Sequence, residues 1–392
     1  MKCKLSIIAI AVALSYGASV PVRADNVANT SQAGNDNAIT VLQDAANGVQ
    51  TATVNQSGDR NSGDVSQTGG NFFGPATATI NQTGNDNSAH VQQSIYAGPI
   101  SASVTQSGNG NTAGAVQNNE SFSQTTISQT GDNNTANTVQ DAIQNGVASI
   151  TQNGTHNQAT ITQNDFAFGS GTGNSASISQ SGDSFQGTIL QTGSGTTLNS
   201  ASVVQSGRGS GQANITQRGV NHSASITQTT SFDDQASVTQ SGSTNSANVL
   251  QDNSWSSTVN VNQSGSNLTA SVSMTAISDF SSAVVTQSGS GHAATVTQAR
   301  ALNSTASITQ TGTGANHATV NQGVGLTGNN FSHFNDAIIN QTGSSDVATI
   351  SQTGVGTAAS HNVATVTQTG VGNQATVAQS GGAGNHTTIT QH

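Results

Sequence analysis

A glutamine recurs along almost the whole chain at a mean spacing of about 12.4 residues. The series runs from Gln32 to Gln391 and contains 29 glutamines and one replacement, Met274. Around each member the residues alternate with a period of two, as in the segment Asn87–Gln93, NSAHVQQ. This period predicts a β-strand with Asn, Ala, Val or Ile, and Gln on one face and mainly Thr, Ser and Asn on the other. The glycine two residues after most glutamines marks a turn. The sequence therefore predicts 30 strand-and-turn units.

The composition limits how such strands can bury a core. Only 32% of the residues are hydrophobic and 3% are aromatic, too few for a conventional core of large apolar side chains. Short repeats can instead stack, so that each unit buries its inner face against its neighbours. We therefore predict an all-β fold, a cross-β β-solenoid with two strands per coil and about 15 coils, in which like residues align about 4.8 Å apart.

Stacking gives the inner polar side chains a structural role. Amide side chains on successive coils can bond to one another, which satisfies buried Gln and Asn. We call these columns the amyloid ladder. The predicted ladder residues are Gln56, Gln67, Gln82, Gln93, Gln106, Gln117, Gln129, Gln140, Gln152, Gln163, Gln240, Gln251, Asn87, Asn111, Asn134, Asn157, Asn245 and Asn373.

The links between units alternate in length. One link is short, with glutamines 11 residues apart, as from Gln82 to Gln93, and the other extends to 19 residues, from Gln322 to Gln341. Up to Gln191 the short link follows the odd-numbered units of the series, and from Gln217 on it follows the even-numbered units, so the alternation shifts near Gln205. We therefore predict that the variable loops, with their aromatic residues, change edges of the coil there. The predicted edges carry Phe72, Phe73, Tyr96, Phe122, Phe166 and Phe168 on one side, and Phe232, Trp255, Phe280, Phe331 and Phe334 on the other.

The N-terminus is typical of a secretory signal peptide. Two lysines, Lys2 and Lys4, precede the apolar segment Leu5–Leu14, and a small-residue cleavage site follows at Val22–Ala24. We predict a signal peptide at residues 1–24 and a repeat β-solenoid at residues 25–392. Residues 25–392 contain no second long apolar run, so we expect no membrane span.

Residues 25–392 are acidic and lack cysteine. They contain four arginines and no lysine against 17 acids, a net charge of about −13. Such a chain has no basic surface for nucleic acid. It also forms no disulfides.

The unit Gln-x-Gly-x-x-Asn-x-Ala-x-x-x-Gln occurs at Gln106, Gly108, Asn111, Ala113 and Gln117, and again in series along the chain. It resembles the curlin repeat of bacterial curli subunits, and the resemblance covers essentially all of residues 25–392.

The resemblance implies a structural subunit of extracellular curli-type amyloid fibres. Such a subunit would self-polymerise and serve the biofilm matrix, adhesion and cell aggregation. It implies a homopolymer on the cell surface, with a curli nucleator subunit and the outer-membrane curli secretion channel as partners. The chain has no basic C-terminal repeat, which favours a major subunit over a nucleator.

No motif in the sequence points to catalysis, a metal or a cofactor. The nine histidines have no ligand spacing, the acids do not follow the calcium-binding nonapeptide, and no nucleophile elbow is present. We therefore expect no enzyme. Four acids follow turn glycines, where they either solvate the turn or act as charged gatekeepers against aggregation: Asp59, Asp86, Asp132 and Asp183. The alternative function is a monomeric secreted β-solenoid adhesin or a surface-, ice- or glycan-binding protein, which would need capped ends.

Overall fold

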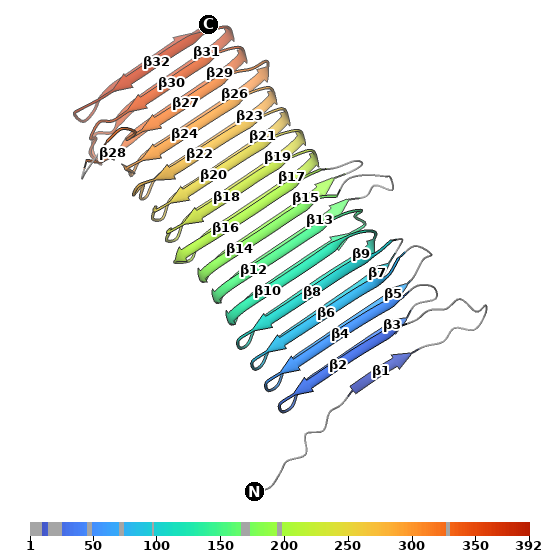
Figure 1. Ribbon diagram of the computed structural model, residues 1–392. Helices are drawn as coiled ribbons and strands as arrows, with labels where there is room; N and C mark the ends of the chain where they lie inside the picture. Colours follow the sequence, from blue (N-terminus) through green and yellow to red (C-terminus); the bar gives the residue numbers. More distant parts are fainter. Residues whose placement is uncertain are drawn as a thin grey trace. The chain divides into compact units, whose positions relative to one another are not determined.

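The computed structural model describes residues 10–14, 26–44, 49–69, 74–95, 98–165, 173–193, 198–326 and 330–392. These residues form β-strands and links, with no helix among them (Figure 1). It follows that no described segment is a helix long and apolar enough to cross a membrane. The chain divides into an N-terminal unit, residues 1–199, and a C-terminal unit, residues 200–392.

In the N-terminal unit successive strands alternate between two parallel sheets, which we name N1 and N2. Like residues stay in register, because Gln129 of one strand pairs with Gln106 on one side and Gln152 on the other. Sheet N1 contains β1 (Ile10–Leu14), β3 (Ala38–Asp44), β5 (Ser62–Gly69), β7 (Ser88–Ile95), β9 (Thr112–Glu120), β11 (Thr135–Asp141), β13 (Gln158–Asp165) and β15 (Gln186–Gly193). Sheet N2 contains β2 (Val27–Ala33), β4 (Gln50–Ser57), β6 (Ala76–Thr83), β8 (Ile100–Ser107), β10 (Gln124–Asp132), β12 (Val147–Thr155) and β14 (Ser175–Asp183).

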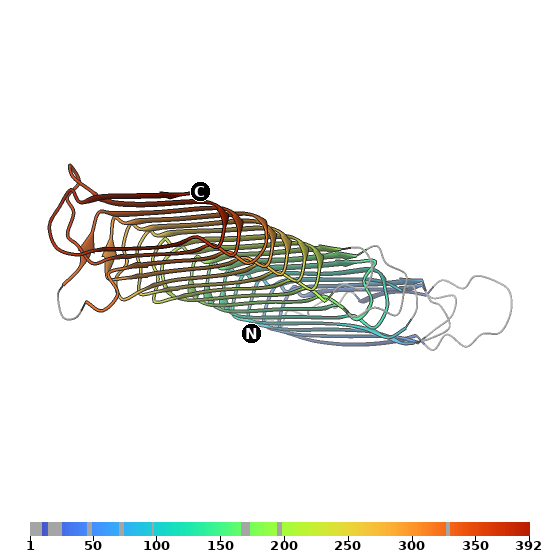
Figure 2. The same cartoon turned by 90° about the horizontal axis from the view of Figure 1, so that it is seen from above.

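The C-terminal unit repeats this arrangement in two parallel sheets, C1 and C2. Sheet C1 contains β17 (Gln212–Val220), β19 (Gln235–Ser243), β21 (Thr258–Ser266), β23 (Ser282–Ser290), β26 (Thr305–Thr313), β29 (Asn335–Ser344), β31 (Asn362–Val371) and β33 (His386–Gln391). Sheet C2 contains β16 (Ser200–Arg208), β18 (Ser223–Thr229), β20 (Ser246–Asp252), β22 (Thr269–Thr275), β24 (Ala293–Ala299), β27 (His317–Gln322), β30 (Val347–Gln352) and β32 (Gln374–Gln379). Two short strands in the links, β25 (Ala301–Leu302) and β28 (Ser332–His333), pair with each other. In Figure 2 the links of this unit, coloured yellow to red, join its strands at both ends.

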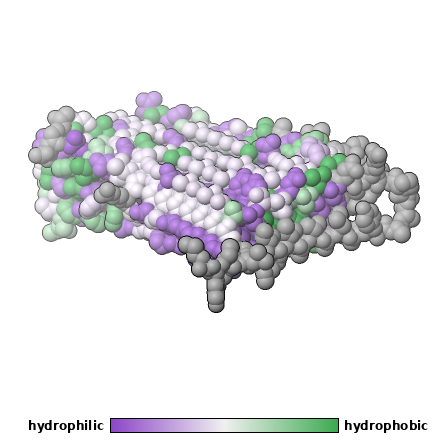
Figure 3. Space-filling view, turned by 60° about the horizontal axis from the view of Figure 1, so that its bottom comes forward, coloured by the Kyte–Doolittle hydropathy of each residue, from purple (hydrophilic) through white to green (hydrophobic). Residues whose placement is uncertain are grey.

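The structure confirms the predicted β-solenoid with two strands per coil. Each glutamine of the series, and Met274, lies on a strand of its own. The inner face is as predicted: in β8 the side chains of Ala102, Val104 and Gln106 are buried, and the residues between them are more exposed. Each fully buried Val or Ile contributes about 1.5–3 kcal/mol, so a narrow interior suffices when it is repeated in every coil. The surface in Figure 3 is mostly pale or purple, with scattered green groups.

The turn glycines have a steric cause. Gly131 has a φ of +106°, and a Cβ at this position would lie 2.1 Å from the carbonyl oxygen of Gly154 in the following coil. Both the backbone conformation and the close approach exclude other residues. The spacing of glycine after glutamine therefore follows from the stacking of coils.

The short link follows different strands in the two units. In the N-terminal unit it leads from a strand of sheet N2 to the next strand of N1, as from β8 to β9. In the C-terminal unit it leads from C1 to C2, as from β19 to β20. Phe122 lies in a link from N1 to N2, whereas Phe232, Trp255, Phe280, Phe331 and Phe334 lie in links from C2 to C1. Phe72, Phe73, Tyr96, Phe166 and Phe168 lie outside the described residues, and the change of edge stays a prediction.

Strand β1 belongs to the segment predicted as a signal peptide. It pairs in parallel with β3, from Ile10 opposite Ile39 to Leu14 opposite Gln43. Strand β1 therefore covers the edge of β3 that does not pair with β5. The division into residues 1–24 and 25–392 stays a prediction.

Candidate functional site

The glutamines of the N-terminal unit form two continuous columns. Each Nε2 donates a hydrogen bond to the Oε1 of the glutamine in the following coil, at 2.8–2.9 Å. The column in sheet N2 consists of Gln32, Gln56, Gln82, Gln106, Gln129, Gln152 and Gln180. The column in sheet N1 consists of Gln43, Gln67, Gln93, Gln117, Gln140, Gln163 and Gln191.

Most of these amides use their second N–H as well. Gln106 Nε2 also donates to the carbonyl of Ser88 on the opposite strand, at 3.0 Å. A buried amide without partners would be costly, so these two bonds make an interior glutamine tolerable. Every bond in the columns runs in the same direction, from the donor amide in one coil to the acceptor in the next. The glutamine columns are therefore polar.

The short turns of the N-terminal unit carry an asparagine column of opposite polarity. Asn111 donates from Nδ2 to Oδ1 of Asn87 in the preceding coil, at 3.1 Å, and to the carbonyl of Gly131 in the following coil, at 2.7 Å. Its backbone N–H also donates to Asn87 Oδ1. The column, which we name the N-turn row, consists of Asn37, Asn61, Asn87, Asn111, Asn134 and Asn157.

Three segments of the chain, residues 144–182, 281–312 and 361–392, match the curlin associated repeat. Each segment spans consecutive strands that carry column glutamines. These segments are curlin associated repeats, and they support membership of the curlin-repeat family. Curlin repeats belong to structural proteins rather than enzymes, and they occur in extracellular curli subunits. No curated protein matches the chain.

The C-terminal unit also has two glutamine columns. The one in sheet C1 is continuous and consists of Gln217, Gln240, Gln263, Gln287, Gln310, Gln341, Gln368 and Gln391. The one in sheet C2 is interrupted by Met274, which is fully buried between Gln251 and Gln298. Gln251 keeps its bonds to the carbonyls of Ser257, at 3.0 Å, and of Gln235, at 3.4 Å, but has no column partner ahead of it, and Gln298 Oε1 is buried without a partner.

The short turns of the C-terminal unit carry a mixed row, which we name the C-turn row: His222, Asn245, Leu268, His292, Asn316, Asp346 and Asn373. The two asparagines predicted here do not bond to each other. Asn245 Oδ1 accepts the backbone N–H of Leu268, and the backbone N–H of Asn373 donates to Asp346 Oδ1. The histidines were not predicted as members, although His222 follows Gln217 by the five residues that separate Asn245 from Gln240.

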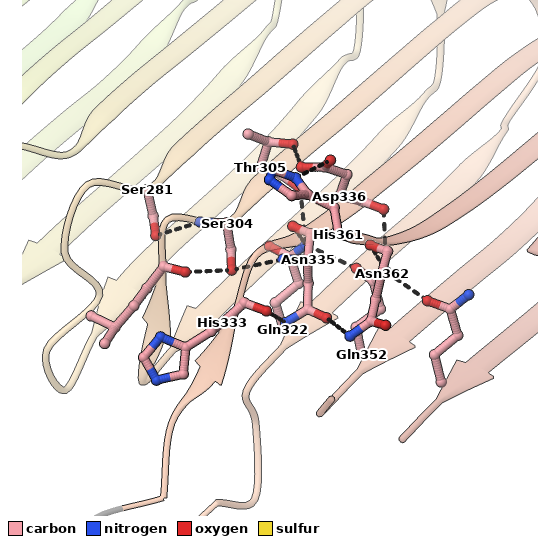
Figure 4. Close-up of polar contacts among 12 residues, drawn as sticks. Ser281, Ser304, Thr305, Gln322, His333, Asn335, Asp336, Gln352, His361 and Asn362 are labelled. Carbon is pink, nitrogen blue, oxygen red and sulfur yellow. Dashed lines mark hydrogen bonds and ion pairs between the residues drawn. The ribbon is translucent and has the colours of Figure 1, made fainter. Parts of the chain in front are cut away.

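A further row, at the points where the C2-to-C1 links lead into the strands of sheet C1, was not predicted from the sequence. Its members, from the first coil to the last, are Asp234, Ser257, Ser281, Ser304, Asn335, Asn362 and Asn385. Figure 4 shows the point at which serine gives way to asparagine: the backbone N–H of Asn335 donates to Ser304 Oγ, and Asn362 Nδ2 donates to Asn335 Oδ1 at 3.0 Å. We name this the link row.

One member of the link row is a buried carboxylate. Asp234 accepts hydrogen bonds from the hydroxyl of Ser254 at 2.6 Å and from the backbone N–H of Ser257 at 2.9 Å. Burial raises the pKa of Asp234, and these bonds oppose that effect. Outside the row, Asp336 pairs with His361 at 2.8 Å (Figure 4). Among the described residues no group of three His, Cys, Asp or Glu could hold a metal ion.

The acids after the turn glycines contact the neighbouring coils. Asp132 Oδ1 accepts the backbone N–H of Asn109 in the preceding coil at 2.7 Å. Asp59 and Asp183 accept backbone N–H groups in the same way, from Asn35 and Thr155. These acids therefore bond the turn of the preceding coil, a role that neither sequence interpretation included. Their effect on aggregation stays a prediction.

The fourth of these acids forms an ion pair. Asp86 pairs with Arg60 at 2.6 Å on the surface. The hydrogen bond from Arg60 lowers the pKa of Asp86.

The columns end at strand edges. Within the described chain β32 and β33 each pair on one side only, as does β2. Gln391 Nε2 donates to the carbonyl of Gln374 at 2.9 Å, while its Oε1 accepts from Gln368. Its second N–H has no acceptor among the described residues. At the other end Gln32 donates to Gln56, and no described residue donates to Gln32 Oε1.

Proposed function

We propose that this protein is a self-polymerising structural subunit of extracellular curli-type amyloid fibres, with roles in biofilm matrix, adhesion and cell aggregation. The observation that carries the proposal is the polarity of the glutamine columns. The last strands of the C-terminal unit end in amide donors, and the first strands of the N-terminal unit begin with amide acceptors. Because unpaired strand edges recruit further strands, two copies fit face to opposite face.

The column geometry favours one register for the proposed joint. In that register β33 of one copy pairs with β3 of the next, and β32 pairs with β2. Gln391 then donates to Gln43, and Gln379 donates to Gln32. This continues both columns across the joint with the pairing that neighbouring coils already use, such as Gln368 opposite Gln391.

The link row supports the same register. It changes from serine to asparagine in the last three coils, ending at Asn385. Asn37, the first member of the N-turn row, also lies in a link that leads to a ladder strand, here β3. In the proposed joint the two asparagines stack, and Asn385 Oδ1 accepts from Asn37. The row would then run through consecutive asparagines from one copy to the next.

The signal peptide has a part in this proposal. Strand β1 covers the edge of β3 that the joint requires. Removal of residues 1–24 on secretion would expose that edge. The further partners proposed are a curli nucleator subunit and the outer-membrane curli secretion channel, with this chain as the major subunit.

The test is assembly of the exported protein, followed by thioflavin fluorescence and fibre diffraction. The proposal predicts fibres with reflections near 4.7–4.8 Å and about 10 Å. Replacing Gln391→Leu and Gln32→Leu removes the donor at one face and the acceptor at the other, and should slow growth. Replacing Thr390→Leu, which is exposed on the same strand, is the matched control. A chain that stays monomeric without cross-β reflections would contradict the proposal and favour the adhesin.

A further inference from the structure

The column in sheet C2 has a thioether where its other members carry amides. Met274 on β22 is fully buried, and in register it lies between Gln251 and Gln298. The sequence contains two methionines, and the other is Met1. Residues 25–392 therefore have a single thioether that an oxidant can modify, and it lies inside a hydrogen-bonded column.

Oxidation would give this thioether the shape of a glutamine side chain. Hydrogen peroxide transfers one oxygen atom to Sδ: the O–O bond breaks, an S–O bond forms and water leaves, so that sulfur is oxidised and the peroxide is reduced. The sulfoxide has the same heavy-atom connectivity as glutamine. Sulfur takes the place of Cδ, the new oxygen takes the place of Oε1, and the methyl group takes the place of Nε2.

Gln251 can supply a donor for the new oxygen. One coil earlier, Gln228 Nε2 contacts two carbonyls, at 3.2 and 3.1 Å, and still donates to Gln251 Oε1 at 2.9 Å. Gln251 Nε2 has the equivalent contacts, to the carbonyls of Gln235 and Ser257. In the direction of the column it meets Met274, whose thioether is only a weak acceptor. A sulfoxide oxygen would give this N–H a strong one.

The neighbour on the other side offers no such donor. Gln298 Oε1 is buried without a partner, and Gln298 Nε2 donates to Gln322 in the following coil at 2.8 Å. The polarity of the column therefore makes the site asymmetric. We propose that Met274 is an oxidation site, at which the sulfoxide formed by peroxide is held in the column by a hydrogen bond from Gln251 and is accommodated by the fold.

This outcome differs from that of oxidation in an ordinary core. A buried sulfoxide usually disrupts packing, because its oxygen is polar. An oxygen without a donor would increase local opening by roughly 5- to 150-fold. A bond from Gln251 removes this penalty. Since Met274 is fully buried in the folded chain, peroxide reaches it before the unit folds, and an oxidised chain can still complete the column.

Hydrogen exchange of β20 and β22 in the exported protein tests the proposal. The chain is oxidised with hydrogen peroxide in denaturant and refolded, and mass spectrometry verifies the gain of one oxygen atom. Opening of these strands should differ by less than about threefold from that of the untreated chain, because the oxygen is hydrogen-bonded. The same treatment of Met274→Leu should leave exchange unchanged, which assigns the effect of oxidation to position 274.

Two glutamine-to-leucine variants identify the donor. In Gln251→Leu, oxidation should increase opening by at least about fivefold, because the sulfoxide oxygen has lost its donor. Gln298→Leu is the matched control: it removes the glutamine on the other side, and oxidation should again change opening by less than about threefold. Comparing oxidised and untreated chains of the same variant cancels the cost of the substitution itself.

Two results would overturn the proposal. One is an oxidised chain of unmodified sequence that opens as much faster as the oxidised Gln251→Leu chain. The other needs no variant, because ¹⁸O-labelled peroxide isolates the S–O stretch of the single sulfoxide in an infrared difference spectrum. The stretch should lie at the frequency of a hydrogen-bonded sulfoxide, and the frequency of a free sulfoxide would contradict the bond from Gln251. Both readouts apply to monomers and fibres alike.

Discussion

Replacing Met274→Gln should stabilise the C-terminal unit. Met274 interrupts the column in sheet C2 and is fully buried. In register it faces Gln251 on one side and Gln298 on the other. A glutamine here would accept from Gln251 Nε2 and donate to Gln298 Oε1, which is buried without a partner. The substitution therefore removes an unsatisfied acceptor and completes the column.

The expected gain can be estimated from its parts. Satisfying a buried acceptor recovers about 1–3 kcal/mol, and the second new hydrogen bond adds about 1 kcal/mol. Glutamine keeps the two methylenes of methionine but loses the apolar sulfur and methyl, which opposes the gain by roughly 1.5 kcal/mol. The net change is a stabilisation of about 1 kcal/mol, or roughly a fivefold decrease in local opening.

Hydrogen exchange of β22 and β24 measures this change, with the guanidinium midpoint as a global check. Met274→Leu is the matched control, because it keeps an apolar side chain of similar size and adds no amide. Exchange in that variant should be the same or faster. If Met274→Gln exchanges faster than Met274→Leu, then the columns do not stabilise the fold, and the reasoning is wrong.

Three further substitutions test other parts of the structure. Asp346→Asn should raise the free energy of unfolding by roughly 1–2 kcal/mol, and with it the guanidinium midpoint, because the buried Oδ2 of Asp346 lacks a partner and an amide could donate there. An unchanged midpoint would show that the oxygen is satisfied in solution. Gly131→Ala should destabilise the fold by roughly 2 kcal/mol or more, since φ is +106° and the carbonyl of Gly154 is too close for a Cβ. An unchanged thermal unfolding temperature would contradict this. Arg60→Ala should leave the midpoint within error, because its ion pair with Asp86 is exposed.

Much of the fold was predictable because the chain is periodic. The alternation around residues such as Gln106 places Ala, Val and Gln inside, and a period of two has only one structural reading at this length. The positions of the turn glycines follow from the same period. The stacked asparagines at Asn87 and Asn111 also come together as predicted, although their role as an amyloid ladder is a proposal.

Other features depend on contacts between coils that a single unit does not encode. The opposite polarity of the Gln and Asn columns arises from where each amide finds its second acceptor, a carbonyl across the coil for Gln106 and a glycine carbonyl in the next coil for Asn111. The link row escaped prediction because its members follow links of variable length. The histidines of the C-turn row were read as scattered, although their spacing from the preceding glutamine was visible.

The joint between copies is the central claim, and a cysteine cross-link tests it most directly. Thr388 on β33 and Thr40 on β3 are exposed, and the proposed register sets them opposite each other. Adjacent parallel strands lie about 4.8 Å apart, within the Cα separation of about 4.4–6.8 Å that a disulfide bridges. Exported protein that carries both Thr388→Cys and Thr40→Cys should form disulfide-linked multimers in its fibres. Neither single variant should form these multimers. Cross-linking of Thr40→Cys alone, or fibres of the double variant without cross-links, would contradict end-to-end joining in this register.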